Sequence, residues 1–275
     1  MLGRILGGFF WDFYDNLGQA IIGNIVAFLL SIPAFIVLLF CITVKLPPLL
    51  LLFSLGLAAA LFSIPLIGLY HQAQRMVEQR EIHLKHYWEG IRLFWKPALI
   101  STLVFYAVLA LLAVNVYFYV QLKGGMRTPG LLLAGLTFWA AIFILISGQY
   151  LYPLIVQQNP GLKKLFTRMI LLSLDNLGAT LLTGITTLSV VMLTVLTVVG
   201  PVILSFTILA VHSQNLLFEV LDKYEKKETP PPPPPVEKPT SWHQIRNREK
   251  QIEAAKPKWR HDGRGWKDIL RPWDM

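Results

Sequence analysis

Charged residues are scarce in this chain, and cysteine is almost absent. Only 15% of the 275 residues are charged, against roughly 25% in a typical soluble domain. Hydrophobic residues make up 54% of the chain, and the mean hydropathy is +0.53. The single cysteine, Cys41, excludes an internal disulfide. This composition is typical of a membrane protein.

Sequence motifs that carry known chemistry are also missing. The chain has no Gly-rich phosphate loop, no Gly-x-Ser-x-Gly nucleophile motif and no His-Glu-x-x-His metal motif. His83 and His86 are three residues apart with Glu89 following, but no cysteine or further histidine clusters near them. We therefore predict no catalytic residues, no metal site and no cofactor, and we do not expect an enzyme.

Six long apolar runs dominate the first 221 residues. Each can cross a hydrocarbon core of roughly 30 Å as a helix of about 20 residues, and none has Asp, Glu, Lys or Arg in its interior. Backbone groups find no water inside lipid, so spanning segments are expected to be helices. The sequence predicts an all-α polytopic membrane bundle. Its predicted spans are residues 17–44, 46–70, 98–122, 130–156, 177–199 and 201–221, the last two divided by Gly200 and Pro201.

The basic residues set the expected orientation. With six spans in three hairpins, the two termini and the second and fourth connections share one side. That side holds all 25 basic residues except Lys45, Lys123 and Arg127. The positive-inside rule places it in the cytoplasm, so we expect a multi-pass protein of the cytoplasmic (inner) membrane with both termini inside. A pI near 9.7 then reflects topology and contact with anionic lipid headgroups, and no nucleic-acid partner is expected.

The composition changes abruptly after Leu221. We interpret residues 1–221 as a membrane domain and residues 222–275 as a cytoplasmic tail. Consecutive prolines at 230–235 predict a stiff polyproline II spacer of about 19 Å. Beyond it, tryptophans recur every seven residues and are candidates for contact with a membrane surface or a partner, the alternative being a largely disordered tail. These tryptophans are Trp259, Trp266 and Trp273.

The connection between the second and third predicted spans contains an amphipathic stretch. Its aromatic residues recur at helical spacing, and its basic residues lie between them, as expected of a helix in the membrane interface. We predict an anchoring elbow before the third span, with a docking helix for a protein partner as the alternative. The candidate elbow residues are Tyr87, Trp88, Arg92, Phe94, Trp95 and Lys96. Similar cytoplasmic elbows are predicted around residues 162–170 and at the N-terminal stretch FFWDFY.

Polar residues inside the apolar runs are the usual pointers to function in a membrane protein. Asn24, Gln149, Thr183 and His212 fall roughly 9–14 Å from the cytoplasmic ends of their predicted spans, counted at 1.5 Å per residue. They are candidates for a polar layer that lines a cavity open to the cytoplasm. The alternative is that they only form hydrogen bonds between helices. Because the interiors of the runs lack carboxylates, an ion-coupled carrier is disfavoured.

The four-residue string Asp-Asn-Leu-Gly occurs twice, at residues 15–18 and 175–178. Each copy precedes a predicted span on the same side of the membrane, which excludes an inverted repeat of three plus three helices. Asn16 followed by Gln19 has the spacing of a helix N-cap, and Asp175 and Asn176 can cap in the same way. We interpret both copies as helix starts.

Residues 63–99 resemble the central signature of the YesL-like family of bacterial membrane proteins. The chain has a Pro-x-x-Gly-Leu-Tyr span end at 65–70, a basic connection, and then an elbow carrying Tyr87, Gly90, Arg92, Phe94 and Lys96. The segment Leu-Leu-Ser-Ile-Pro at 29–33 resembles the end of that family's first span. The proline spacer and the Trp-bearing tail depart from the family pattern. The resemblance implies a six-span fold and an accessory role beside carbohydrate uptake systems, but no catalytic residue.

A permease subunit of an ATP-driven importer is the competing interpretation. Such subunits share a cytoplasmic Glu-Ala-Ala loop with a downstream Gly and a later Ile-x-Leu-Pro. Here Glu89-Gly90 is followed by Pro97 too early, and the rest of the motif is missing. We therefore predict an accessory or scaffold protein of a membrane complex, with a protein partner in the membrane, and keep a permease-like transporter subunit as the alternative.

Overall fold

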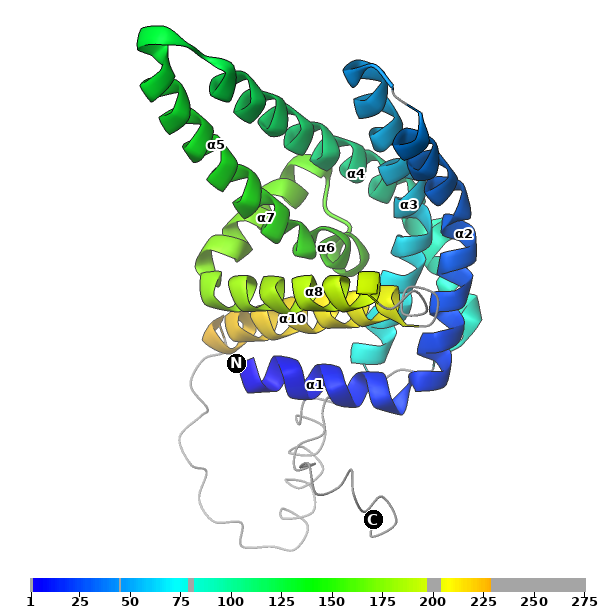
Figure 1. The fold of residues 1–275 in the computed structure, drawn as a ribbon. Coiled ribbons are helices and arrows are strands. Elements are labelled where there is room, and N and C mark those ends of the chain that lie inside the picture. The colour runs from blue at the N-terminus through cyan, green and yellow to red at the C-terminus, as the bar shows by residue number, and fades with distance from the viewer. Residues whose placement is uncertain (1, 45, 79–81, 197–203, 229–275) are drawn as a thin grey trace, which may run out of the picture. The chain divides into compact units, whose positions relative to one another are not determined.

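A computed structural model describes residues 2–44, 46–78, 82–196 and 204–228, whose regular structure is helical throughout. Figure 1 shows these helices. In chain order the α-helices are α1 (Leu2–Asp15), α2 (Leu17–Thr43), α3 (Pro48–Val77), α4 (Leu84–Gln121), α5 (Arg127–Ser147), α6 (Leu151–Gln158), α7 (Leu162–Asp175), α8 (Leu177–Leu196) and α10 (Ser205–Glu228). Short 3-10 turns, Gly124–Met126 and Gly148–Tyr150, precede α5 and α6.

Four described helical segments are long and apolar enough to cross a membrane. They are Leu17–Thr43, Leu50–Val77, Leu84–Gln121 and Gly124–Gln158, and the pair α7 and α8, bent by 100°, makes a fifth if it is one broken span. The helix α10 is not among them. The predicted all-α class is confirmed, and by helix length and hydropathy this is a polytopic membrane protein.

The exposed surfaces of these helices carry many large apolar side chains. Large side chains such as Ile42, Phe53, Leu111 and Trp139 are exposed on α2, α3, α4 and α5. Apolar surface on this scale is not found on monomeric soluble proteins but suits contact with lipid chains. The buried face of α2 instead carries small residues at helical spacing, namely Ala20, Gly23, Asn24, Ala27, Ser31 and Ala34. Such small residues let membrane helices approach closely.

The predicted elbow before the third span is not a separate helix. It forms the first turns of α4, which continues from Leu84 to Gln121 through Pro97. At 1.5 Å per residue a helix of 38 residues is about 57 Å long, so roughly half of it extends beyond a hydrocarbon core. Proline lacks the N–H of one helical bond, but this is tolerated in long apolar helices where neighbours satisfy the freed carbonyl.

The tightest packing lies between α3 and α4, which run antiparallel. The hydroxyl of Tyr106 donates to the Leu52 carbonyl over 2.6 Å, and that of Tyr87 donates to the Pro65 carbonyl over 3.0 Å. Glycines make room for these contacts: a Cβ on Gly68 would lie 2.9 Å from the Tyr87 ring. The Gly-Leu-Tyr string at the end of the second apolar run therefore marks a close helix crossing.

Both copies of Asp-Asn-Leu-Gly lie where an amphipathic helix meets an apolar one. The first joins α1 to α2 and the second joins α7 to α8. The side-chain amide of Asn16 donates to the Asp12 carbonyl over 2.8 Å, and that of Asn176 donates to the Leu172 carbonyl over 3.2 Å. The prediction of helix starts is confirmed in position. The predicted N-cap bond of Asn16 is wrong, and the amides of Asn16 and Asn176 each close the end of the preceding helix.

Contacts divide the chain into two compact units, Met1–Val220 and Leu221–Met275. All the sites described below lie in the first unit. The predicted turn at Gly200 and Pro201, the proline spacer at 230–235 and the three tail tryptophans (Trp259, Trp266 and Trp273) lie outside the described residues.

Replacing Gly90 with alanine tests the α3–α4 packing. The new Cβ would lie 2.5 Å from the Cβ of His71, which cannot move without its backbone, so we expect a loss of stability of about 1–3 kcal/mol. The matched control is Gly135→Ala in α5, where a Cβ meets no atom within 4 Å. Thermal unfolding in detergent micelles should show a lower midpoint for Gly90→Ala alone. Equal midpoints would contradict the packing described.

Candidate functional site

The helix α10 concentrates buried polar side chains in its first four turns. Thr207, His212, Ser213, Gln214 and Asn215 are all buried there. Burying an unpaired amide or hydroxyl in an apolar surrounding is costly, so such groups need partners within the bundle. Their partners come from α2, α3, α6 and α8, which makes α10 the helix on which the candidate polar residues converge.

Asn24 of α2 contacts the start of α10. Its side-chain oxygen accepts from the backbone N–H of Thr207 over 3.0 Å, and the Thr207 hydroxyl donates to the Ala20 carbonyl over 3.1 Å. Thr207 lies in the first turn of α10, where backbone N–H groups have no acceptor within the helix. Asn24 therefore caps α10 from a distant part of the chain.

Gln214 connects α10 to α3 and α6. Its side-chain amide donates to the Tyr70 carbonyl over 3.1 Å, and its oxygen accepts from the Gln157 amide over 3.1 Å. Both Gln214 and the adjacent Asn215 are fully buried. A single glutamine thus uses both ends of its amide to join three helices.

His212 and Thr183 face each other across the α8–α10 pair, which runs side by side in Figure 1. The His212 Nε2 atom lies 2.6 Å from the Thr186 hydroxyl, and that hydroxyl lies 2.9 Å from the Thr183 carbonyl. The Thr183 hydroxyl donates within its own helix to the Ala179 carbonyl over 2.8 Å. His212 is therefore held by a hydrogen-bonded chain from α8.

Gln149 contacts α8 at a different level. Its amide nitrogen donates to the Thr180 carbonyl over 2.9 Å, and the neighbouring Tyr150 hydroxyl lies 2.9 Å from the Thr180 hydroxyl. Gln149 also lines a cavity of about 610 Å³ between α5 and the α8–α10 pair. Asn24, Thr183 and His212 do not line it.

The four predicted polar residues therefore lie at three separate helix contacts, with Thr183 and His212 at the same one. Asn24 joins α2 to α10, Gln149 joins the α5–α6 turn to α8, and His212 joins α10 to α8. The hydrogen bonds of Asn24, Gln149 and His212 run between helices, as the alternative interpretation expects, whereas the Thr183 hydroxyl bonds within α8. This arrangement can hold helices in register, and it assigns the four residues no shared binding surface.

Sequence reasoning overlooked a buried carboxylate. Glu219 lies near the end of the run at 201–221, on α10, and only 2% of its surface is exposed. The argument that the runs carry no carboxylate is wrong at this position. Asp12 on α1 is likewise almost fully buried. An acidic residue near the end of an apolar run was the available signal for Glu219.

Gln72 is a second buried group that sequence reasoning did not single out. Its amide nitrogen donates to the Gln19 carbonyl over 3.2 Å, which joins α3 to α2. Gly23 makes space for it, since a Cβ there would collide with the Gln72 side-chain oxygen. Only the position of Gln72 at the end of the second apolar run marked it in advance.

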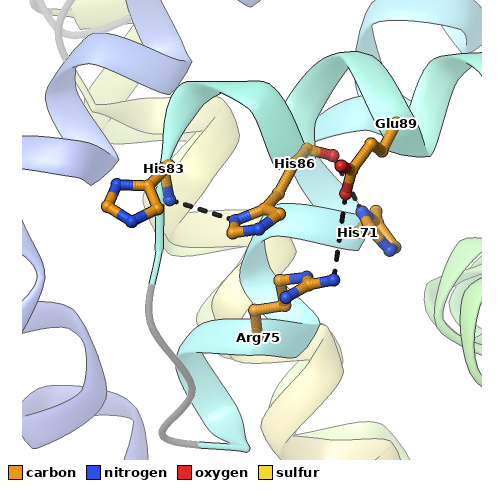
Figure 2. Close-up of polar contacts among 5 residues, drawn as sticks. All are labelled: His71, Arg75, His83, His86 and Glu89. Atoms are coloured by element: carbon orange, nitrogen blue, oxygen red, sulfur yellow. Dashed lines mark hydrogen bonds and ion pairs between the residues drawn. The ribbon is translucent and has the colours of Figure 1, made fainter.

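The histidines near the start of α4 form a compact network (Figure 2). The backbone N–H of His83 donates to His86 Nδ1 over 3.1 Å, and His71 Nδ1 lies 2.8 Å from the His86 carbonyl. Since a carbonyl only accepts, His71 Nδ1 carries the proton. Glu89 pairs with Arg75 at 3.8 Å. Within the described ranges, no three His, Cys, Asp or Glu side chains are placed to hold a metal ion.

The candidate elbow residues divide between the interior and the surface. Tyr87 is fully buried and belongs to the α3–α4 contact, while Phe94 is half-buried with its ring 5.8 Å from that of His71. Trp88 and Trp95 are exposed, and Lys96 lies over the Trp95 ring at 5.5 Å. Arg92 is exposed as well. The exposed members of the set form an aromatic and basic surface at the start of α4.

Comparison with known proteins finds no relative for this chain. No family model matches it, no curated protein matches it, and no solved structure matches it. The functional argument therefore depends on the residues and their geometry.

Proposed function

We propose that this chain is an accessory or scaffold protein of a membrane complex and has no catalytic activity. The observation that supports this most directly is the use of its buried polar residues. Asn24, Gln149 and His212 each bond to a neighbouring helix, which supports a role in holding the bundle together over a role in binding a solute.

We propose six spans in three hairpins, with both termini in the cytoplasm. The hairpins are α2 with α3, α4 with the segment from α5 to α6, and α8 with α10. The first two consist of helices of spanning length. Two observations support the third: α8 is joined to α10 through Thr186 and His212, and the Asn16 and Asn176 joints place α2 and α8 in equivalent positions.

The exposed surface at the start of α4 is the proposed partner contact. Trp88 and Trp95 are exposed beside Arg92 and Lys96, and aromatic residues with arginine are the types that dominate protein interfaces. On the proposed topology this surface lies at the cytoplasmic boundary, where it can contact anionic headgroups and another membrane protein. The resemblance to the YesL-like family suggests a carbohydrate uptake system as one such complex.

A permease-like transporter subunit is the second candidate, and the cavity beside Gln149 is the observation that favours it. A transporter of a polar solute needs several convergent polar groups in its binding site. The cavity wall is mostly Ile, Leu and Val, and no charged side chain of the described part of the chain lines it. This lining disfavours a sugar or an ion as the occupant.

Single cysteines test the proposed topology. In a Cys41→Ser background, Gly125→Cys lies in the turn before α5 and Gly161→Cys lies at the start of α7, and both positions are exposed. A maleimide that cannot cross membranes should label position 125 in intact cells and position 161 only after permeabilisation. The reverse pattern, or labelling of both positions from outside, would contradict the orientation.

Recovery of partners from native membranes tests the scaffold proposal. The tagged full chain should bring down another membrane complex, and the double variant Trp88→Ala/Trp95→Ala should lose most of it because its aromatic contacts are removed. The control is Trp139→Ala, an exposed tryptophan on α5, which should retain the complex. Stoichiometric recovery of an ATPase or a solute-binding protein would favour the permease instead.

A further inference from the structure

The cavity beside Gln149 has features that neither a scaffold nor a helix contact requires. Its volume of about 610 Å³ lies inside the range of roughly 300–1,000 Å³ that is usual for small-molecule sites. Its wall comes from α5, α8, α10 and the end of α3. The apolar part consists of Ile142, Leu145, Ile146, Leu181, Ile185, Leu188, Val191 and Leu209.

The rim of the cavity is apolar and opens away from the bundle. Leu145, Ile185 and Leu188 line it, yet each is 60% exposed. In a membrane protein, exposed apolar side chains such as these on α5 and α8 face the lipid chains. A molecule reaching this cavity sideways therefore comes from the bilayer, and its greater part has to be hydrocarbon.

Two oxygens in the wall lack hydrogen-bond partners within the described structure. They are Gln149 Oε1 and Thr187 Oγ1. The orientation of the Gln149 amide is fixed, because its nitrogen must be the atom that faces the Thr180 carbonyl. Each oxygen has less than 1 Å² of exposed surface, so neighbouring side chains of the wall have to move apart when a ligand bonds to it.

An unpaired polar atom in an apolar wall raises the free energy of the protein, and a ligand group that forms a hydrogen bond to this atom removes the penalty. A hydroxyl suits both oxygens, since it donates to the Gln149 acceptor and either donates to or accepts from the Thr187 hydroxyl. A charged headgroup does not suit them, because no cationic or anionic side chain of the described residues lines the cavity to balance it.

We propose that this cavity binds a neutral lipid with one hydrocarbon chain and a hydroxyl group. The chain occupies the space among the Ile, Leu and Val side chains, and the hydroxyl is held at Thr187, whose oxygen is unpaired in the cavity wall. The lipid enters between α5 and α8 from the bilayer. This site is separate from the exposed aromatic surface of α4, so it can be tested independently of the proposed partner contact.

Photo-crosslinking of the full chain in phosphatidylcholine nanodiscs tests this site. The probe is 1-hexadecanol carrying a diazirine on its chain, and crosslinked positions are mapped by mass spectrometry. Labels should fall on the lining residues of α5, α8 and α10. Unlabelled 1-hexadecanol should displace the probe at a concentration roughly fivefold lower than hexadecane does, the difference expected for one net hydrogen bond. Palmitate should compete less well than 1-hexadecanol.

Two variant pairs locate the binding groups. Thr187→Val should remove the advantage of 1-hexadecanol over hexadecane without loss of fold stability, because the hydroxyl it deletes has no partner. Its control is Thr137→Val, whose exposed hydroxyl bonds only to its own helix. Val191→Trp at the rim should abolish labelling, whereas Val114→Trp, at a similarly exposed valine on α4 outside the cavity, should not.

Three results would overturn the proposal. The first is labelling spread over the exposed helix surfaces that 1-hexadecanol does not displace, and the second is equal displacement of the probe by 1-hexadecanol and hexadecane. The third is that 1-hexadecanol still displaces the probe better than hexadecane in the Thr187→Val variant.

Discussion

The hydrogen bond from the Thr207 backbone to the side chain of Asn24 spans 183 positions of the chain and joins α2, the first long apolar helix, to α10. It exists because backbone and side-chain polar groups buried among apolar residues have to be paired. The same requirement explains Gln214 between α3 and α6, and His212 beside Thr186. The α10 helix is less apolar than the long helices around it, and its polar side chains bond to α2, α3, α6 and α8.

Small and proline residues complete this arrangement. Gly68 and Gly90 let α3 and α4 approach until Tyr87 reaches the Pro65 carbonyl, and Gly23 leaves room for Gln72. Hydrophobic attraction does not drive helices together in lipid, so close packing and hydrogen bonds have to do so. Gly68, Tyr87 and Gly90 are therefore residues of helix packing. Their presence indicates how the helices cross and does not identify a chemical reaction.

The helical class and the positions of four long apolar helices followed from run length and the absence of charge, since both are local properties of the sequence. The continuity of α4 could not be predicted in this way. In the sequence, an amphipathic stretch and an apolar span look like separate elements, but the helix runs through both without a break. The separation of Asn24, Gln149 and His212 could not be predicted either. Equal depth in a membrane does not determine in which direction each side chain points around its helix axis. Glu219 was missed for a simpler reason: it lies near the end of a run, and only the interiors of the runs were considered free of charge, yet the fold buries it.

The central claim is that polar residues on α10 serve to tie helices together. A double-mutant cycle on His212 and Thr186, joined at 2.6 Å, measures this directly with His212→Phe, Thr186→Val and the double variant in thermal unfolding experiments. We predict a coupling free energy of about 0.5–1.7 kcal/mol, as for other hydrogen bonds between membrane helices. Strictly additive losses of stability would contradict the claim.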